Sequence, residues 1–245
     1  MIDDTALMAI AAARRLRDGE ACFVGIGVPS LAALIARHTH APGMSLIYES
    51  GAYGADPAVL PMSTGSPSVA TGAACLGDCT LVFGELQAGR IDVGVLSAAQ
   101  VDRRGNLNST VIGDYRTPKV RMVGSGGAHD IASLVGRLVI VMPHDPRRFT
   151  ERVDFVTAPG LGEDGRRPVG TRGAGPVDLL TPRAWFTFET GEMTLAGLQP
   201  GMGAAAAVEG FSWKVPHAED VVELAPPTGE ELALLRRWHG KVETT

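Results

Sequence analysis

One carboxylate in this chain stands where a reactive group would be expected. Glu49 directly follows the apolar run Leu46-Ile47-Tyr48 and precedes Ser50-Gly51. This order is typical of a strand that ends at a tight turn, so the carboxylate should stand at the end of a strand. A carboxylate in that position can be a metal ligand, a general base, a nucleophile or a capping group. No pair of His or Asp residues nearby favours a metal site, and no second carboxylate lies close enough in sequence for a glycosidase-type pair.

Two further glycine-bearing turns lie between an expected strand and an expected helix. They are Gly25-Ile26-Gly27-Val28-Pro29-Ser30 and Gly124-Ser125-Gly126-Gly127-Ala128. Where a glycine turn opens a helix, its free backbone N–H groups can face an anion. A turn of this kind can equally serve only to pack a helix against a strand. The sequence alone leaves both roles open for each turn.

Other reactive residues fit known catalytic patterns poorly. Ser125 lies in Gly-Ser-Gly-Gly, which lacks the G-x-S-x-G arrangement of a nucleophilic serine. The turn that begins at Gly25 has Ser30 where a dinucleotide-binding fingerprint has its third glycine. Cys75 and Cys79 are four residues apart, but no histidine or second cysteine pair completes a zinc site. We therefore predict no metal site, and the strand-end carboxylate stays the foremost candidate.

Short apolar runs alternate with helical segments along the chain, and these elements must position the three turns. The runs expected to be strands are 22–26, 46–48, 80–83, 92–98, 120–123, 138–142 and 154–157. The segments expected to be helices are 5–17, 31–36, 85–89 and 128–135. Such alternation predicts an α/β fold with an open, mostly parallel sheet and helices on both faces. In these sheets ligands bind outside the carboxyl ends of the strands, where the three turns should lie.

The chain changes character after Pro159. Residues 160–175 are rich in glycine and charge and have no apolar period, so they form either a loop or an exposed flap over the site. The shorter strands expected beyond them are 183–189, 193–198 and 209–215, and a last helix is expected at 229–239. We predict a single domain over residues 1–245 with a shorter-stranded C-terminal part.

Composition narrows the class of protein. Of the 245 residues, 45% are hydrophobic and only 5% aromatic, which suits the aliphatic core of a parallel sheet covered on both faces. The net charge of -5 comes without a basic stripe, so nucleic acid is not an expected partner. No apolar run reaches the roughly 18 residues of a membrane helix. Three cysteines and an acidic start without a signal peptide predict a cytoplasmic protein with no membrane partner.

Four motifs, in this order, resemble those of class I coenzyme A transferase β subunits. Residues 25–30 resemble the G-I-G-[IV]-P-[ST] turn, Glu49-Ser50-Gly51 the E-[NS]-G catalytic motif, and 124–130 the G-x-G-G-A-x-D loop. Between the second and the third of these motifs, residues 98–108 are similar to a family stretch that ends in G-x-x-N. The serine of the second motif resembles the branch of the B-type subunits of glutaconate CoA-transferase more than the 3-oxoacid branch, which has asparagine there.

The resemblance implies a CoA-transferase with an open CoA-transferase or NagB-like fold and a ping-pong mechanism. Glu49 would attack an acyl-CoA thioester and later carry CoA as a glutamyl thioester, which a carboxylic acid then attacks. Gly126 and Gly127 would stabilise the oxyanion through their backbone N–H groups. The further residues implied to contact the substrate or CoA are Gly25, Gly27, Ser50, Gly51, Gln100, Asn108 and Ala128. Gln100 and Asn108 can alternatively serve only to hold their turns.

The resemblance also implies a partner and a substrate. A separate α subunit would complete a heteromer, a CoA thioester would be a substrate, and no tightly bound cofactor is expected. The acyl group stays open: Arg116, Lys119 and Arg121 can pair with a second substrate carboxylate or a CoA phosphate, or lie on an exposed strand edge.

Two other functions fit the same sequence less well. The alternative enzyme is a ring-opening CoA-thioester hydrolase on the same fold, but that branch does not keep the glutamate. A metabolite-sensing regulator would need a DNA-binding segment, and only one helix is expected before Cys22.

Overall fold

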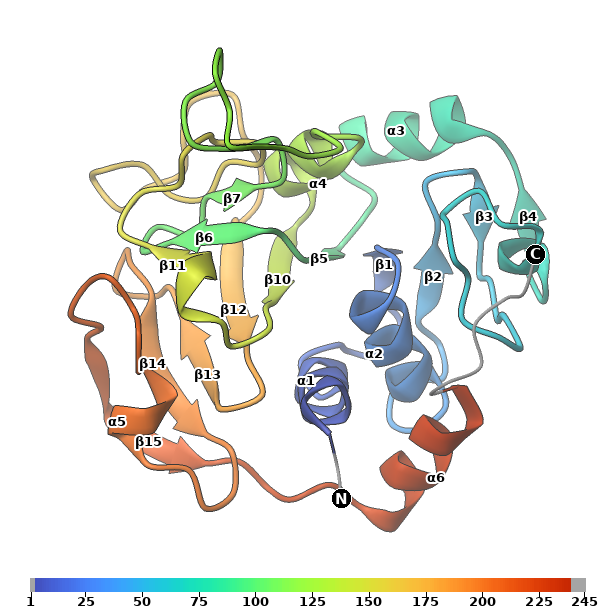
Figure 1. Cartoon of the computed structure of the whole chain (residues 1–245). Helices are drawn as coiled ribbons and strands as arrows, with labels where there is room; N and C mark the ends of the chain where they lie inside the picture. The colour runs from blue at the N-terminus through green and yellow to red at the C-terminus, as the bar shows by residue number, and fades with distance from the viewer. Residues whose placement is uncertain (1–2, 239–245) are drawn as a thin grey trace.

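A ten-stranded sheet forms the centre of the computed structural model, which describes residues 3–238 (Figure 1). Its order is β15-β14-β13-β12-β10-β5-β1-β2-β3-β4. The five central strands run parallel: β12 (Pro176–Leu180), β10 (Arg137–Val141), β5 (Val93–Leu96), β1 (Ala21–Val24) and β2 (Ser45–Ile47). The predicted open α/β sheet with a parallel centre is therefore confirmed.

Antiparallel strands extend the sheet at both edges. On one side are β13 (Ala184–Thr187) and β14 (Thr194–Leu198), followed by β15 (His217–Glu223), which runs parallel to β14. On the other side are β3 (Ala52–Tyr53) and β4 (Cys75–Leu76). A small sheet comprises β6 (Gln100–Asp102), β7 (Leu107–Asn108) and β11 (Phe149–Thr150), while β8 (Val111–Ile112) and β9 (Val120–Arg121) form a hairpin.

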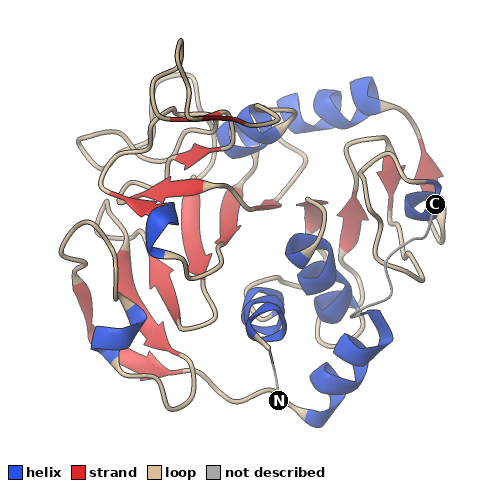
Figure 2. Cartoon of the chain, viewed as in Figure 1, coloured by secondary structure: helices blue, strands red, loops and turns tan. Residues whose placement is uncertain are grey.

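Helices cover both faces of the main sheet (Figure 2). On one face lie α1 (Asp4–Ala13), α2 (Val28–Arg37) and α6 (Gly229–Trp238), which share one buried apolar cluster. On the other lie α3 (Cys79–Gln87) and α4 (Ala128–Leu134), which belong to a second cluster, and the single turn α5 (Ala204–Ala207) packs there too. Among residues 3–238, no helix combines the length and the apolar character needed to cross a bilayer.

Several predicted elements are confirmed with shifted ends. The runs 22–26, 46–48 and 138–142 overlap β1, β2 and β10, each of which begins one residue earlier. The runs 92–98, 183–189 and 193–198 contain β5, β13 and β14. The predicted helix at 5–17 ends earlier, at Ala13. The predicted helix at 229–239 is confirmed over Gly229–Trp238, and residue 239 lies outside the described residues. The helices expected at 31–36 and 128–135 correspond to α2 and α4.

Other predicted elements were wrong. Residues 80–83 are not a strand but part of α3, because the Asp78 carboxylate accepts a hydrogen bond from the Leu81 N–H and starts a helix there. Residues 154–157 and 209–215 form no strand, whereas β12 and β15 were not predicted. The run 120–123 contributes only two residues, to the β8–β9 hairpin outside the main sheet.

Candidate active site

Glu49 lies at the tip of a tight turn between β2 and β3. The Gly51 N–H donates to the Tyr48 carbonyl over 3.0 Å, and the Tyr48 N–H donates to the Ala52 carbonyl over 3.0 Å. Gly51 has φ +114°, and a Cβ there would lie 2.4 Å from the Gly77 backbone, so only glycine fits. This turn leaves Glu49 half-buried and Ser50 exposed, at the carboxyl end of β2 as the sequence predicts.

A buried hydrogen-bond chain fixes the base of this turn. Tyr48, directly before the glutamate, is fully buried, and its hydroxyl donates to Ser30 Oγ over 3.2 Å. Ser30 in turn donates to the Gly25 carbonyl over 2.6 Å. Burial raises the pKa of Tyr48 to about 12, so its hydroxyl stays a donor at neutral pH. The β1–α2 turn, with Gly25 and Gly27, is thereby tied to the strand end that carries Glu49.

The glycine loop before α4 lies directly against the Glu49 carboxylate. A Cβ built on Gly127 would lie 3.2 Å from Glu49 Oε1. Gly126, with φ +48°, has open space where a Cβ would be, and Ala128 begins the helix. Among the described residues, neither the Gly126 nor the Gly127 N–H meets an acceptor. The loop therefore offers two free donors and an open approach beside a carboxylate.

Phe83 also lies beside the Glu49 carboxylate, and the sequence analysis did not identify it as a site residue. The same Cβ on Gly127 would lie 2.7 Å from Phe83 Cζ. The phenyl ring and the Glu49 carboxylate therefore both lie against the Cα of Gly127. Phe83 comes from α3 and packs on Phe23 of β1 at 6.2 Å between ring centroids. The Asp78 cap could have identified the helix, but nothing local in sequence places Phe83 beside Glu49.

Gln100 and Asn108 lie in an interior polar network. Asn108 Nδ2 donates to Gln100 Oε1 over 2.7 Å and to the Val111 carbonyl over 2.6 Å, and both amides are buried. Gln100 Nε2 donates to Asp154 Oδ2 over 3.1 Å. Of the two roles left open by the sequence, these contacts support holding the turns.

That network reaches the glycine loop through one residue. Ser109 Oγ donates to the Gly124 carbonyl over 2.8 Å, and the Gly124 N–H donates back to the Ser109 carbonyl over 3.0 Å. The Ser109 N–H itself donates to Thr157 Oγ1 over 2.9 Å. The start of the loop is thus fixed on the small β6–β7 layer, while its end lies against Glu49.

Residues 160–175 form a loop that is fastened to the far end of α4. Arg167 Nη2 donates to the Ala132 carbonyl over 2.7 Å, and Arg167 Nη1 donates to the Gly160 carbonyl over 2.7 Å. The Arg172 N–H donates to the Ser133 carbonyl over 2.6 Å. Burial lowers the pKa of Arg167, which reflects how closely its guanidinium is packed. Of the loop and the flap, these contacts favour a packed loop.

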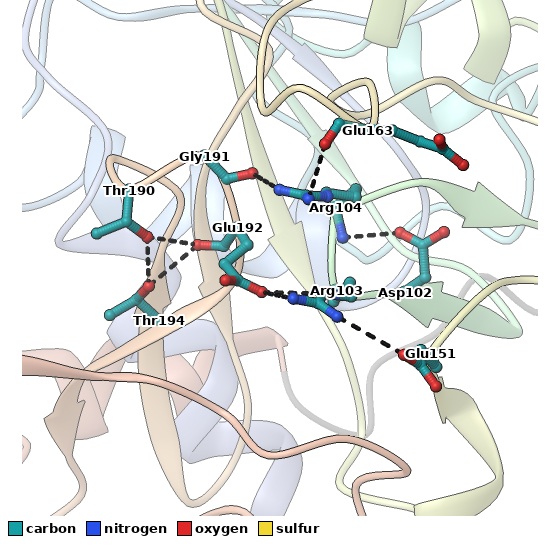
Figure 3. Close-up of polar contacts among 9 residues, drawn as sticks. All are labelled: Asp102, Arg103, Arg104, Glu151, Glu163, Thr190, Gly191, Glu192 and Thr194. Atoms are coloured by element: carbon teal, nitrogen blue, oxygen red, sulfur yellow. Dashed lines mark hydrogen bonds and ion pairs between the residues drawn. The ribbon is translucent and has the colours of Figure 1, made fainter.

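A second polar cluster holds the C-terminal strands to the β6–β7 connection (Figure 3). Arg103 pairs with Glu192 at 2.6 Å and with Glu151 at 3.6 Å. Arg104 donates to the carbonyls of Gly191 and Glu163. Each charged group in this cluster has a partner, so its role is structural.

The other candidate residues lie on other elements of the fold. Arg116, Lys119 and Arg121 lie on the β8–β9 hairpin, where the Arg121 guanidinium stacks 4.8 Å above the Tyr115 ring. Cys75 and Cys79 are exposed free thiols. Within residues 3–238, no group of three or more His, Cys, Asp or Glu side chains could hold a metal ion.

Comparisons with known proteins agree with this geometry. The family model described as Coenzyme A transferase matches residues 5–172. The chain is 46% identical over 239 residues to the B-type subunit of 3-oxoadipate CoA-transferase from Pseudomonas knackmussii, covering 94% of this chain and 90% of that protein. It is 34% identical over 243 residues to the B-type subunit of glutaconate CoA-transferase from Acidaminococcus fermentans, with the same coverage.

Comparison of the fold with solved structures also points to coenzyme A transferases. The crystal structure of glutaconate coenzyme A-transferase from Acidaminococcus fermentans matches with a TM-score of 0.87 at 31% identity, covering 96% of this chain and 93% of that chain. These relatives are named as transferases, which favours CoA transfer over the ring-opening hydrolysis that the sequence had left as an alternative. The family model spans well over half of the sequence. The chain belongs to the coenzyme A transferase family.

Proposed function

We propose that this chain is the β subunit of a heteromeric CoA-transferase in which Glu49 is the covalent nucleophile. The observation that carries the proposal is how close the Glu49 carboxylate lies to Gly127: a Cβ built on that glycine would lie 3.2 Å from Glu49 Oε1. It places a carboxylate beside the two free N–H groups of Gly126 and Gly127. A nucleophile next to preorganised donors is what acyl transfer requires.

The reaction proceeds by successive acyl exchanges. A Glu49 oxygen attacks the thioester carbonyl of the acyl-CoA, the C–S bond breaks, and a mixed anhydride and CoA thiolate result. The thiolate then attacks the Glu49 side-chain carbonyl, which forms a glutamyl-CoA thioester and releases the first carboxylate. The acceptor carboxylate attacks this thioester to give a second anhydride and thiolate. Attack of that thiolate on the acceptor's carbonyl yields the new acyl-CoA and restores Glu49.

Each addition creates an oxyanion, and the free N–H groups of the glycine loop supply donors for it. Removing one such donor typically costs about 10²–10³-fold in rate. A carboxylate is a weak nucleophile that gains most from positioning and partial loss of water. The Phe83 ring and the tight turn around Glu49 supply both, since they restrict the carboxylate and cover one side of it.

An α subunit and a dicarboxylic substrate complete the proposal. The relatives are named as B-type subunits of 3-oxoadipate and glutaconate CoA-transferases, and both acids carry two carboxylates. We assign the α-facing surface to Leu76 and Leu81, which are 63% and 42% exposed. They flank Gly77, whose backbone packs on Gly51 of the Glu49 turn. A CoA thioester is the substrate without a tightly bound cofactor, and a cytoplasmic location stays our prediction.

Trapping the glutamyl thioester tests the mechanism. The chain, co-purified with its α subunit, is incubated with glutaryl-CoA and then with borohydride, and the reduced residue is located by mass spectrometry. We expect reduction at Glu49 that depends on the acyl-CoA. The Glu49→Gln variant should show none, and the Glu85→Gln variant, altered on neighbouring α3, should behave as the parent. Release of CoA without an acceptor and without modification of Glu49 would contradict covalent transfer.

A further inference from the structure

A cavity of about 620 Å³ lies at the amino ends of the central parallel strands, whereas Glu49 follows the carboxyl end of β2. Arg137 at the start of β10 and Pro176 at the start of β12 line it, together with Arg14, Arg15 and Arg17 just after α1. Glu49 follows the end of β2, and β2, β10 and β12 run parallel through the sheet centre. The cavity is therefore separated from the Glu49 site by the length of the strands.

Two of the four arginines in this cavity are accounted for by the fold. Arg14 forms a bidentate pair with Glu231 of α6, with both N–O distances at 2.7 Å. Arg137 pairs with Glu20 through three hydrogen bonds of 2.7–3.0 Å. The first pair holds α6 to the end of α1, the second holds β10 to the residue before β1, and the donors of both arginines are largely used.

The other two arginines, Arg15 and Arg17, form no such direct ion pair with any residue of the range 3–238. The Arg15 guanidinium stacks 3.9 Å above the Trp185 ring, and its Nε is buried without a hydrogen-bond partner. Among the described residues, neither Arg15 nor exposed Arg17 forms a side-chain ion pair or hydrogen bond. A buried donor without an acceptor costs about 1–3 kcal/mol. The outer Nη1 and Nη2 groups of Arg15 also have no partner among the described residues and are not buried, so they are the donors that a ligand in the cavity can reach.

The surroundings hold the Arg15 guanidinium in place. Trp185 Nε1 donates to Asp178 Oδ1 over 2.6 Å, which fixes the ring on which the guanidinium lies. A stacked guanidinium keeps its in-plane N–H groups free for a forked contact with a carboxylate or phosphate. The acids that line the cavity are Glu189, which is exposed at the rim, and Asp178, whose carboxylate accepts from the indole and also faces the charges of Arg15, Arg137 and Arg17.

We propose that this cavity binds the oxyanion of a small molecule, either a carboxylate or a phosphate, on Arg15 with Arg17 as the second cation. The Arg15 fork holds two oxygens, and Arg17 closes the solvent side. The bound anion connects the end of α1 to β12 and β13, so it stabilises the folded chain. The site lies apart from the Glu49 turn and takes no part in the chemistry.

Calorimetric titration of the co-purified complex tests this site with two probes, inorganic phosphate and succinate, at low ionic strength. We expect saturable binding of at least one probe and a rise in the thermal midpoint. The Arg15→Gln and Arg17→Gln variants should each weaken binding by about tenfold or more, as for a lost charged hydrogen bond. The tighter probe identifies the oxyanion class.

Two controls make the test decisive. Arg236→Gln changes an exposed arginine on α6 outside the cavity and should leave binding unchanged, as should Glu49→Gln. If Arg15→Gln fails to fold, Arg17→Gln carries the test, because Arg17 is exposed. Absence of saturable binding by both probes would overturn the proposal. Binding that persists in every folded variant of Arg15 and Arg17, or that disappears in Glu49→Gln, would also overturn it.

Discussion

At the scale of single residues, the absence of a side chain at position 127 decides whether the site can form. In Gly127→Ala the new Cβ would lie 2.7 Å from Phe83 Cζ and 3.2 Å from Glu49 Oε1, so one of them must move. Misplacement by about 1 Å costs on the order of 10²-fold in rate. We expect kcat of the complex to fall by about that factor with little change in thermal unfolding.

Gly84→Ala is the matched control for this substitution. Gly84 is exposed in α3, next to Phe83, and a Cβ there meets nothing within 4 Å. The change should keep full activity and slightly stabilise the helix. The double variant Gly127→Ala/Phe83→Ala should recover part of the lost kcat, because it removes the closest contact. Full activity in Gly127→Ala alone would show that the close approach is not needed.

At the scale of elements, the 160–175 loop sets the position of α4 and so of Gly127. Arg167→Ala removes the bonds to the Ala132 and Gly160 carbonyls, and each charged hydrogen bond contributes about 1.5–3 kcal/mol. We expect a lower free energy of unfolding in urea, faster amide exchange over 128–135, and a reduced kcat with little change in KM.

Arg166→Ala provides the comparison for that experiment. Arg166 is the neighbouring residue, is exposed, and has no side-chain hydrogen bond among the described residues. Its substitution should leave stability, exchange and kcat at the parent values. If Arg167→Ala lowers stability but leaves the exchange of α4 and kcat unchanged, the loop does not position the helix.

The elements also show how far the sequence could predict this structure. The strand–turn–helix units at β1–α2 and before α4 were predictable, because a glycine turn between an apolar run and a helical period is a local signal. The run 80–83 was misread since short apolar runs fit a strand or a helix equally well. The polar β15 and the proline-led β12 carry no alternating pattern, so pairing with neighbours alone makes them strands.

Some residues of the candidate site could likewise be predicted from local sequence, and others could not. Glu49 and the glycine loops were found through motifs that are continuous in sequence. Phe83 was not, because its position depends on how α3 lies across α4, which is a long-range property. Gln100 and Asn108 were given two possible roles, and only their burial and their mutual hydrogen bond distinguish between them.

At the scale of the whole molecule, the two edges of the sheet differ in what they expose. Next to the Glu49 turn, β4 and α3 present Leu76 and Leu81, whereas β15 at the far edge presents a largely polar face with Val222 47% exposed. We propose that these two leucines, beside the Glu49 turn, belong to the surface that the α subunit covers. The single-domain prediction stays a proposal, supported by a sheet that includes strands from both halves of the chain.

Association with the α subunit tests that assignment. Burying one leucine contributes about 1.5–3 kcal/mol, so Leu76→Ser and Leu81→Ser should each raise the Kd for the α subunit by about tenfold or more. Val222→Ser, a similar change at the opposite edge, should leave the Kd unchanged, and Glu49→Gln should abolish transfer without weakening association. The Kd can be measured by analytical sedimentation. An unchanged Kd in the Leu76→Ser/Leu81→Ser double variant would show that the α subunit binds another face. The Glu49 site would then have to be completed from the side of the glycine loop.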